Sequence, residues 1–407
     1  MIFGLINLDV CKQVALDRDI IDNNLLDSSF SRLYYKAKNY YLKFSHLTDI
    51  KIPDKVFLPT FNLEEEFQVT QEDVVNTLRK ELKEKCKELE LAKNTLVKRK
   101  LFSDDVYEAI NKANINYSFN FVNVPKVIFS EGNHLILPIS DVHYGEVVKA
   151  NQVNNFNEYN CEIAKKRIVK LFNEALIYAK QNKCSDLNII FLGDIFSGNI
   201  HDELLTTNDY GISVCVMEFY GFISSLIESI KDEFESIKLN AVVGNHPRFQ
   251  KKFQYKNKAI DSFEYFLYHG LYFKFNNKAN FIVNISNSPI DYVDIGCSTW
   301  KIQHGDFYKG GSSPSGPINN ILKNSAQDLD MLETLSAKSY DYELMGHFHQ
   351  PSINHMKGTN IPIIVNSSII GPNEFAINSL HTAFPSSSYL IVTDGMSYQT
   401  KLFYLQD

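Results

Sequence analysis

The sequence predicts an α/β domain from about residue 129 onward, preceded by a mostly helical region over residues 1–128. After residue 129, short apolar runs alternate with helical stretches, which is the pattern of α/β proteins. Several of these runs end in Asp, Asn or His. Sites in α/β sheets gather beyond the carboxyl ends of strands, so the pattern predicts both a fold class and a place for chemistry.

The region 1–128 carries polar and aromatic segments and one long heptad pattern. A leucine-rich stripe recurs every seven residues, at Val75, Leu82, Leu89 and Leu96. This spacing predicts an amphipathic helix near 70–101. The helix can lie across its own domain or pair with a second copy of the chain. We favour the first arrangement and keep a homodimer through this region as the alternative.

The predicted strands of the second region are apolar runs of six or seven residues. They are 134–140, 187–193, 239–244, 281–286, 298–304, 340–346 and 361–366. A helix is predicted between the first two strands, roughly over 158–181, because its apolar residues share one helical face. The stretch 309–317, rich in Gly, Ser and Pro, is predicted to be a flexible loop.

Length and composition narrow the class of protein. The chain has 407 residues, 44% of them hydrophobic and 22% charged, which suits two or three globular domains. Its net charge is −7, whereas proteins that coat duplex nucleic acid are usually basic. A nucleic-acid substrate would therefore have to be bound by a local basic patch or by metal ions.

Cysteine spacing and the N-terminal residues suggest a compartment. The six Cys include no CxxC pair, which argues against a zinc ribbon and a disulfide framework. The first residues lack a basic lead-in and a long apolar core, so no signal peptide is expected. We find no apolar run of about 18 residues. The expectation is a cytoplasmic protein, neither secreted nor bound to a membrane.

Five short motifs follow predicted strands in order. Asp141 and His143 stand two residues apart after the first strand, a spacing that places both side chains on one side of an extended chain. The later motifs are Gly193-Asp194, Gly244-Asn245-His246, His304-Gly305-Asp306 and Gly346-His347-Phe348-His349. A single Asp-x-His pair would be weak evidence, but five such motifs at strand ends indicate a metal site.

This order of motifs resembles the calcineurin-like metallophosphoesterase superfamily, which includes phosphoprotein phosphatases, cyclic-nucleotide phosphodiesterases and nucleases of the SbcD/Mre11 type. The resemblance covers about 130–375. The stretches SDVHYGE, GDIFSGNIHDEL, GNHPR, GHFHQP and VNSSIIGP look most like phage-encoded members. The resemblance implies a four-layer α/β/β/α sandwich with a two-metal site.

The resemblance also implies a ligand set for two divalent metal ions. The first ion takes Asp141, His143, Asp194 and His349, and the second takes Asp194, Asn245, His304 and His347. Asp194 would bridge the two ions, and a water between them would be the nucleophile. Mixed carboxylate and imidazole ligands suit Mn, Fe or Zn better than Mg or Ca, and Mn is our first choice.

Three further residues receive roles near the ions. By resemblance, His246 neutralises charge on the phosphoryl group or protonates the leaving oxygen. His201 could meet substrate or be an exposed loop histidine. Arg248 could hold a phosphate by a bidentate contact or cap a loop.

Two positions depart from the pattern of the better-known phosphatases. Ser197 stands where that pattern has a second Asp, which normally orients the catalytic His, and Pro247 stands where it has an acidic residue. A phosphoprotein phosphatase is therefore disfavoured, and the orienting partner of His246 is left open. All the expected ligands are present, so we do not expect a dead site.

The leading functional hypothesis is a metal-dependent phosphodiesterase, a nuclease acting on nucleic acid, with the N-terminal region helping to bind substrate or partner. The first alternative is a phosphomonoesterase or cyclic-nucleotide phosphodiesterase for small substrates, which the acidic charge favours. The second is a non-catalytic module that only holds metal. If the protein is phage-encoded, its compartment would be the host cytoplasm.

Overall fold

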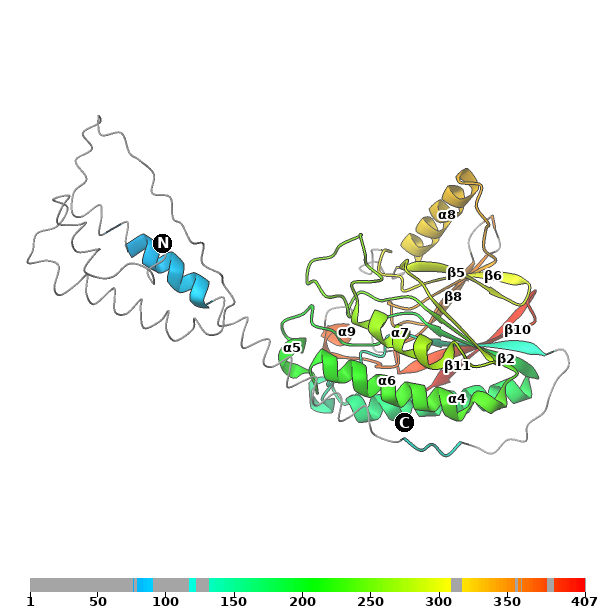
Figure 1. Cartoon of the computed structure of the whole chain (residues 1–407). Helices are drawn as coiled ribbons and strands as arrows, with labels where there is room; N and C mark the ends of the chain where they lie inside the picture. The colour runs from blue at the N-terminus through cyan, green and yellow to red at the C-terminus, as the bar shows by residue number, and fades with distance from the viewer. Residues whose placement is uncertain are drawn as a thin grey trace, which may run out of the picture. The chain divides into compact units, whose positions relative to one another are not determined.

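The structure is a computed structural model of the chain (Figure 1). It describes residues 76, 79–90, 117–121, 132–308, 317–355, 358–359, 361–378 and 384–406. The chain divides into two units between Arg99 and Lys100, and each is considered by itself. Within the first unit, residues 79–90 are helical, and Leu82 and Leu89 of the heptad pattern are exposed. The ends of the helix expected near 70–101 lie outside the described residues, as does most of 1–128. That this region is mostly helical, and that it forms a homodimer, therefore stay predictions.

A six-stranded sheet in the second unit has the order β11-β10-β1-β2-β3-β4. Its strands are β1 (Asn133–Ile139), β2 (Cys184–Phe191), β3 (Ser236–Ala241), β4 (Phe281–Ile285), β10 (Ser387–Thr393) and β11 (Tyr398–Tyr404). The first four run parallel, whereas β10 pairs antiparallel with both β1 and β11. The carboxyl ends of β1, β2 and β3 therefore meet at one edge.

A five-stranded sheet has the order β5-β6-β7-β9-β8. Its strands are β5 (Ile290–Ile295), β6 (Ser298–Gln303), β7 (Tyr342–Met345), β8 (Ser352–His355) and β9 (Pro362–Val365). The central strands β6, β7 and β9 are parallel, and the edge strands β5 and β8 are antiparallel to them. Both sheets are thus mixed, and the predicted α/β class is confirmed.

Helices cover the outer faces of the two sheets (Figure 1). α4 (Cys161–Gln181), α6 (Ile212–Ser229) and α7 (Phe263–Phe275) pack on the six-stranded sheet, and α8 (Ile318–Thr334) packs on the five-stranded one. The shorter elements are α5 (Leu204–Thr207), α9 (Glu374–Asn378) and the 3-10 turns η3 (Ala150–Gln152) and η4 (Lys231–Glu233). α4 begins after Asn160, whose side chain accepts the Ile163 N–H at 2.9 Å, a normal N-cap. The expected helix 158–181 is therefore present and begins three residues later than predicted.

The apolar side chains form three clusters that follow the alternation of the strands. Leu135, Leu137 and Ile139 of β1 pack with α4, α6 and α7, whereas Ile136 of the same strand packs in a cluster with the second sheet. A third cluster joins Ile321 of α8 to β7 and β9. Successive side chains of a strand point to opposite faces, so the order is helices, sheet, sheet, helix.

One helical stretch is as long and apolar as a membrane span. Ile212–Glu233, which contains α6 and η4, has the length and mean hydropathy, 1.3, of a membrane span, and 61% of that window is buried inside the structure. Its side chains Phe219, Phe222 and Ile223 belong to the largest apolar cluster. The expectation that the chain has no apolar run of this length was therefore wrong. The buried share of the stretch is typical of a helix in the core of a protein.

Candidate metal centre

The side chains expected to bind metal all follow the carboxyl ends of central strands. Asp141 and His143 follow β1, Asp194 follows β2, and Asn245 follows β3. From the second sheet come His304 after β6, and His347 and His349 after β7. Backbone hydrogen bonds join these loops: the His143 N–H donates to the Asp194 carbonyl at 2.9 Å, and the Gly346 N–H donates to the His304 carbonyl at 3.0 Å.

Backbone strain is concentrated at these same positions. Five of the expected ligands have positive φ, namely Asp141 (51°), His143 (49°), Asp194 (52°), His347 (72°) and His349 (57°). Residues other than Gly rarely adopt this left-handed conformation, and holding one there costs about 1–3 kcal/mol. Such strain persists where the surroundings over-determine it, typically at functional sites.

Two glycines allow the β2 and β3 loops to approach each other. A Cβ added to Gly193 would lie 2.3 Å from the Gly244 nitrogen, and a Cβ added to Gly244 would lie 2.1 Å from Oδ1 of Asp194. Gly193 also has a φ of 88°. Glycine at these two positions therefore allows the loops to pack closely around Asp194, where any other residue would clash.

The first cluster of donor atoms surrounds His304, which is 1% exposed. Its Nδ1 lies 2.7 Å from the Leu192 carbonyl oxygen, which can only accept, so the proton sits on Nδ1. Its Nε2 lies 3.0 Å from Oδ2 of Asp194, 3.1 Å from Oδ1 of Asn245 and 3.2 Å from Nδ1 of His347. Several lone pairs thus converge on one point, which requires either a second proton on His304 or a shared cation.

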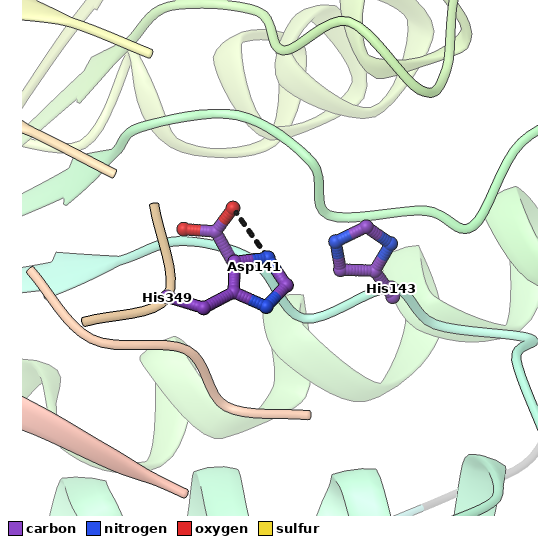
Figure 2. A group of neighbouring side chains, drawn as sticks. All are labelled: Asp141, His143 and His349. Atoms are coloured by element: carbon purple, nitrogen blue, oxygen red, sulfur yellow. Dashed lines mark ion pairs between the residues drawn. The ribbon is translucent and has the colours of Figure 1, made fainter. Parts of the chain in front are cut away.

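The second cluster joins Asp141, His143 and His349, whose donor atoms all lie within 4.8 Å of one another (Figure 2). Oδ1 of Asp141 is 3.3 Å from Nε2 of His349. His143 is 3% exposed, yet neither of its ring nitrogens has a hydrogen-bond partner. Buried polar atoms are normally satisfied, so this pair of orphaned nitrogens fits a histidine that awaits a metal.

The charges of the site leave only part of the ligand set in the protonation states that metals need. Burial alone would lower the pKa of His304, but Asp194 raises it to about 10, and Asp141 likewise raises the pKa of His349, so a metal at these two rings competes with a proton. Burial, followed by the charge of His246, holds the pKa of His143 well below its usual value. Burial and the charge of His304 lower the pKa of His347 to about 4. Burial alone would raise the pKa of Asp194, but the neighbouring His304 and His246 hold it well below its usual value. Neutral imidazoles and ionised carboxylates are the metal-binding forms.

His246 forms a third group with His143 and Asp194, whose donor atoms all lie within 4.8 Å of one another and could also hold a metal ion. Its ring centroid is 4.6 Å from that of His143, and its backbone N–H donates to Oδ1 of Asp194 at 2.8 Å. Its Nδ1 is 3.1 Å from the backbone carbonyl oxygen of Ser197, so Nδ1 carries a proton and Nε2 is the nitrogen left to exchange one. The partner that orients His246 is thus the main chain of Ser197, the position where an Asp side chain was expected.

The two remaining candidates differ in their surroundings. His201 is exposed, with its ring centroid 5.4 Å from that of His246. The guanidinium of Arg248 donates to the carbonyl oxygens of Asn245 at 2.7 Å, Gln250 at 2.9 Å and Lys251 at 2.8 Å. These are the contacts of the loop-capping alternative, and phosphate binding by Arg248 and substrate contact by His201 stay predictions.

Two buried carboxylates support the site and were missed in the sequence. Glu264, 0% exposed, accepts the Ile195 N–H at 2.6 Å and the Gly244 N–H at 2.7 Å, and so ties the β2 and β3 loops together. Burial raises its pKa to about 8. Glu146 has Oε2 3.6 Å from Nδ1 of His143. Glu146 stands within the SDVHYGE stretch and could have been found there, whereas Glu264 has no local signal.

The chain is similar to several solved structures, but only at low sequence identity and low TM-score. No known family profile and no curated protein sequence matches the chain. Among solved structures, a predicted phosphoesterase from Streptococcus pneumoniae TIGR4 matches at 12% identity and a TM-score of 0.30, covering 67% of this chain and 91% of its own. An archaeal phosphodiesterase matches at 12% and 0.30, covering 66% and 99%. Vacuolar Protein Sorting 29 from Cryptosporidium parvum matches at 13% and 0.29, covering 67% and 99%. Likeness at this level assigns no function, which has to come from the site itself.

Proposed function

We propose that this chain is a metal-dependent phosphoesterase whose preferred substrates are phosphodiesters of nucleic acid. One observation carries the proposal: Nε2 of His304 lies 3.0 Å from Oδ2 of Asp194 and 3.1 Å from Oδ1 of Asn245, so the three atoms face one point at which a cation can replace a proton on Nε2. A divalent cation at that point satisfies all three groups. The orphaned ring nitrogens of His143 indicate a second position of the same kind.

The donor set fits transition metals. Carboxylate, amide and imidazole donors together favour Mn, Fe or Zn over Mg or Ca. Asp141, His143 and His349 would hold one ion, Asn245, His304 and His347 would hold another, and Asp194 stands between the two groups. Two such ions supply Lewis acidity toward a phosphoryl group and lower the pKa of water. Low solvent exposure strengthens every charge interaction in the site.

The protein's own acid–base group in the proposal is His246. The Ser197 carbonyl fixes the ring through Nδ1, so Nε2 is the position at which a proton is exchanged with the leaving oxygen. The half-buried ring lies beside the Asp194 cluster and beside exposed His201. A proton donor with this placement is worth about 10²–10⁴-fold in rate.

A panel of substrates tests the proposal and separates its rivals. The full chain, loaded with Mn, is given bis(4-nitrophenyl) phosphate, 4-nitrophenyl phosphate, a cyclic nucleotide, and labelled single-stranded and duplex DNA and RNA. The proposal predicts cleavage of the nitrophenyl diester and of at least one polynucleotide. Turnover confined to the monoester or the cyclic nucleotide would establish the small-substrate alternative. Metal binding without turnover of any ester would establish the non-catalytic module.

A further inference from the structure

We propose that residues 248–258 form a platform for a single strand of nucleic acid beside the metal centre; this inference rests on the proposed function and names its substrate class. The segment, RFQKKFQYKNK, begins two residues after His246, with Pro247 between them. It contains five basic residues, three aromatic residues and no acidic residue, in a chain of net charge −7. Basic side chains interleaved with aromatic ones are the composition of surfaces that bind single strands.

The aromatic side chains of the segment are exposed. Tyr255 is 75% exposed, Phe249 42% and Phe253 37%. The Tyr255 ring is nearly parallel to that of Phe307, with 13° between the planes and 6.5 Å between the centroids, and it meets the Phe253 ring in a T-shaped contact at 4.8 Å. Apolar burial would normally draw such rings inward. Exposed ring faces held in place are surfaces on which unpaired bases can stack.

The segment is tied to the metal-binding loops. Lys258 is buried and pairs with both carboxylate oxygens of Asp306, at 2.5 and 2.6 Å, and Asp306 is two residues from His304. The Nζ of Lys258 also lies 4.0 Å from the centroid of the Phe307 ring. The guanidinium of Arg248 donates to the backbone carbonyls of Gln250 and Lys251 within the segment and of Asn245 before it. The platform is therefore fixed relative to the ligands.

The remaining charges face outward. Lys252 and Lys256 are exposed, and neither has an ion-pair partner among the described residues. Lys251 pairs with exposed Asp202. A small hollow is lined by six residues of the segment together with Asn245 and Asp261; the six are Arg248, Gln250, Phe253, Gln254, Lys256 and Lys258. Lys252 and Lys256 can thus contact phosphates of a strand whose scissile bond lies near Asn245.

The chemistry favours a single strand over the other anionic partners. A duplex keeps its bases stacked inside and offers only phosphates to the lysines, leaving Tyr255 and Phe253 unused. An acidic peptide would pair with the lysines and likewise leave the rings without a partner. Stacking of each base on an aromatic side chain is lost when that side chain is removed, and binding falls about 5- to 150-fold per base.

The test measures binding and chemistry separately on the full chain. Fluorescence anisotropy with a labelled oligothymidylate in EDTA gives binding without cleavage, and Mn-dependent turnover of bis(4-nitrophenyl) phosphate reports the site. Tyr255→Ala should weaken strand binding about 5- to 150-fold and leave the small diester unchanged. Lys256→Gln should weaken strand binding and reduce its dependence on salt. The matched controls are Phe273→Ala, another exposed aromatic (76%), and Lys323→Gln, another exposed lysine.

The outcomes distinguish the two proposals. Strand binding by Tyr255→Ala equal to that of the wild type, with small-diester turnover intact, would overturn the platform and leave the phosphoesterase standing. Loss of strand binding in Tyr255→Ala with no turnover in the wild type would support the platform and overturn the function. A duplex or poly-glutamate that binds more tightly than oligothymidylate would also overturn the platform.

Discussion

Gly244→Ala should damage the metal centre while leaving the fold intact. The added Cβ would lie 2.1 Å from Oδ1 and 2.3 Å from the backbone nitrogen of Asp194, whereas ordinary contacts begin near 3.4 Å. Asp194 must therefore move by about 1 Å, a misplacement that can cost about 10²-fold in rate. Overpacking of this kind costs about 1–3 kcal/mol of stability. Gly244 has no positive φ, so the cost is steric and not conformational.

The assay for Gly244→Ala combines bound metal, turnover of a diester and urea unfolding. The matched control is Gly270→Ala within α7, where the three atoms nearest to the new Cβ all belong to the ring of Tyr220, the first at 2.9 Å. That ring can turn aside, and Ala is favoured over Gly in a helix by about 1 kcal/mol. We expect the control to bind metal and turn over as the wild type does. Unchanged metal content and rate in Gly244→Ala would refute the placement of Asp194 at the centre of the site.

Two further predictions concern chemistry and pH. His246→Ala should keep its metal, measured by elemental analysis, and lose about 10²–10⁴-fold in rate; a near-normal rate with metal bound would transfer the proton-donor role to another group. The hydrogen bond with His134 lowers the pKa of Asp186 to about 2. Its ionised form therefore stabilises the fold above the unfolded pKa of 3.8, and that contribution is lost as pH falls toward 2. Asp186→Asn should lose about 1 kcal/mol in urea unfolding at pH 7 after allowance for solvent screening, and little near pH 2; an equal loss at both pH values would contradict the ion pair.

The sequence predicted those parts of the structure that depend on a local pattern of residues. Apolar runs of six or seven residues predicted the central strands, and the residue types that end them predicted which loops meet. Asp194 and His304 are 110 positions apart, yet each follows a central strand, so their meeting could be inferred from the strand order of an α/β fold. The strands β5, β8 and β11 were missed because half-exposed antiparallel strands carry weaker apolar signals. β10 was also missed, although it is buried along most of its length and its apolar residues Leu390, Ile391 and Val392 stand together in the sequence.

Other features of the site have no local signature. Glu264 acts through two backbone N–H groups 20 and 69 residues away, a relation that only the packing of α7 creates. The partner of His246 is a backbone carbonyl, which any residue at position 197 would supply. The extended chain expected at Asp141 and His143 was wrong: β1 ends at Ile139 and both residues have a left-handed backbone, with φ of 51° and 49°. Their side chains nevertheless belong to one group of donor atoms, as predicted.

The most direct test of the account compares wild type with Asp194→Asn. After EDTA treatment and dialysis, each protein is titrated with Mn while bound metal and bis(4-nitrophenyl) phosphate turnover are recorded together. The account predicts that wild-type turnover rises with metal binding, and that Asp194→Asn binds metal more weakly and loses turnover while remaining folded. Two results would contradict the account: wild-type turnover that persists without metal, or turnover by Asp194→Asn equal to that of the wild type.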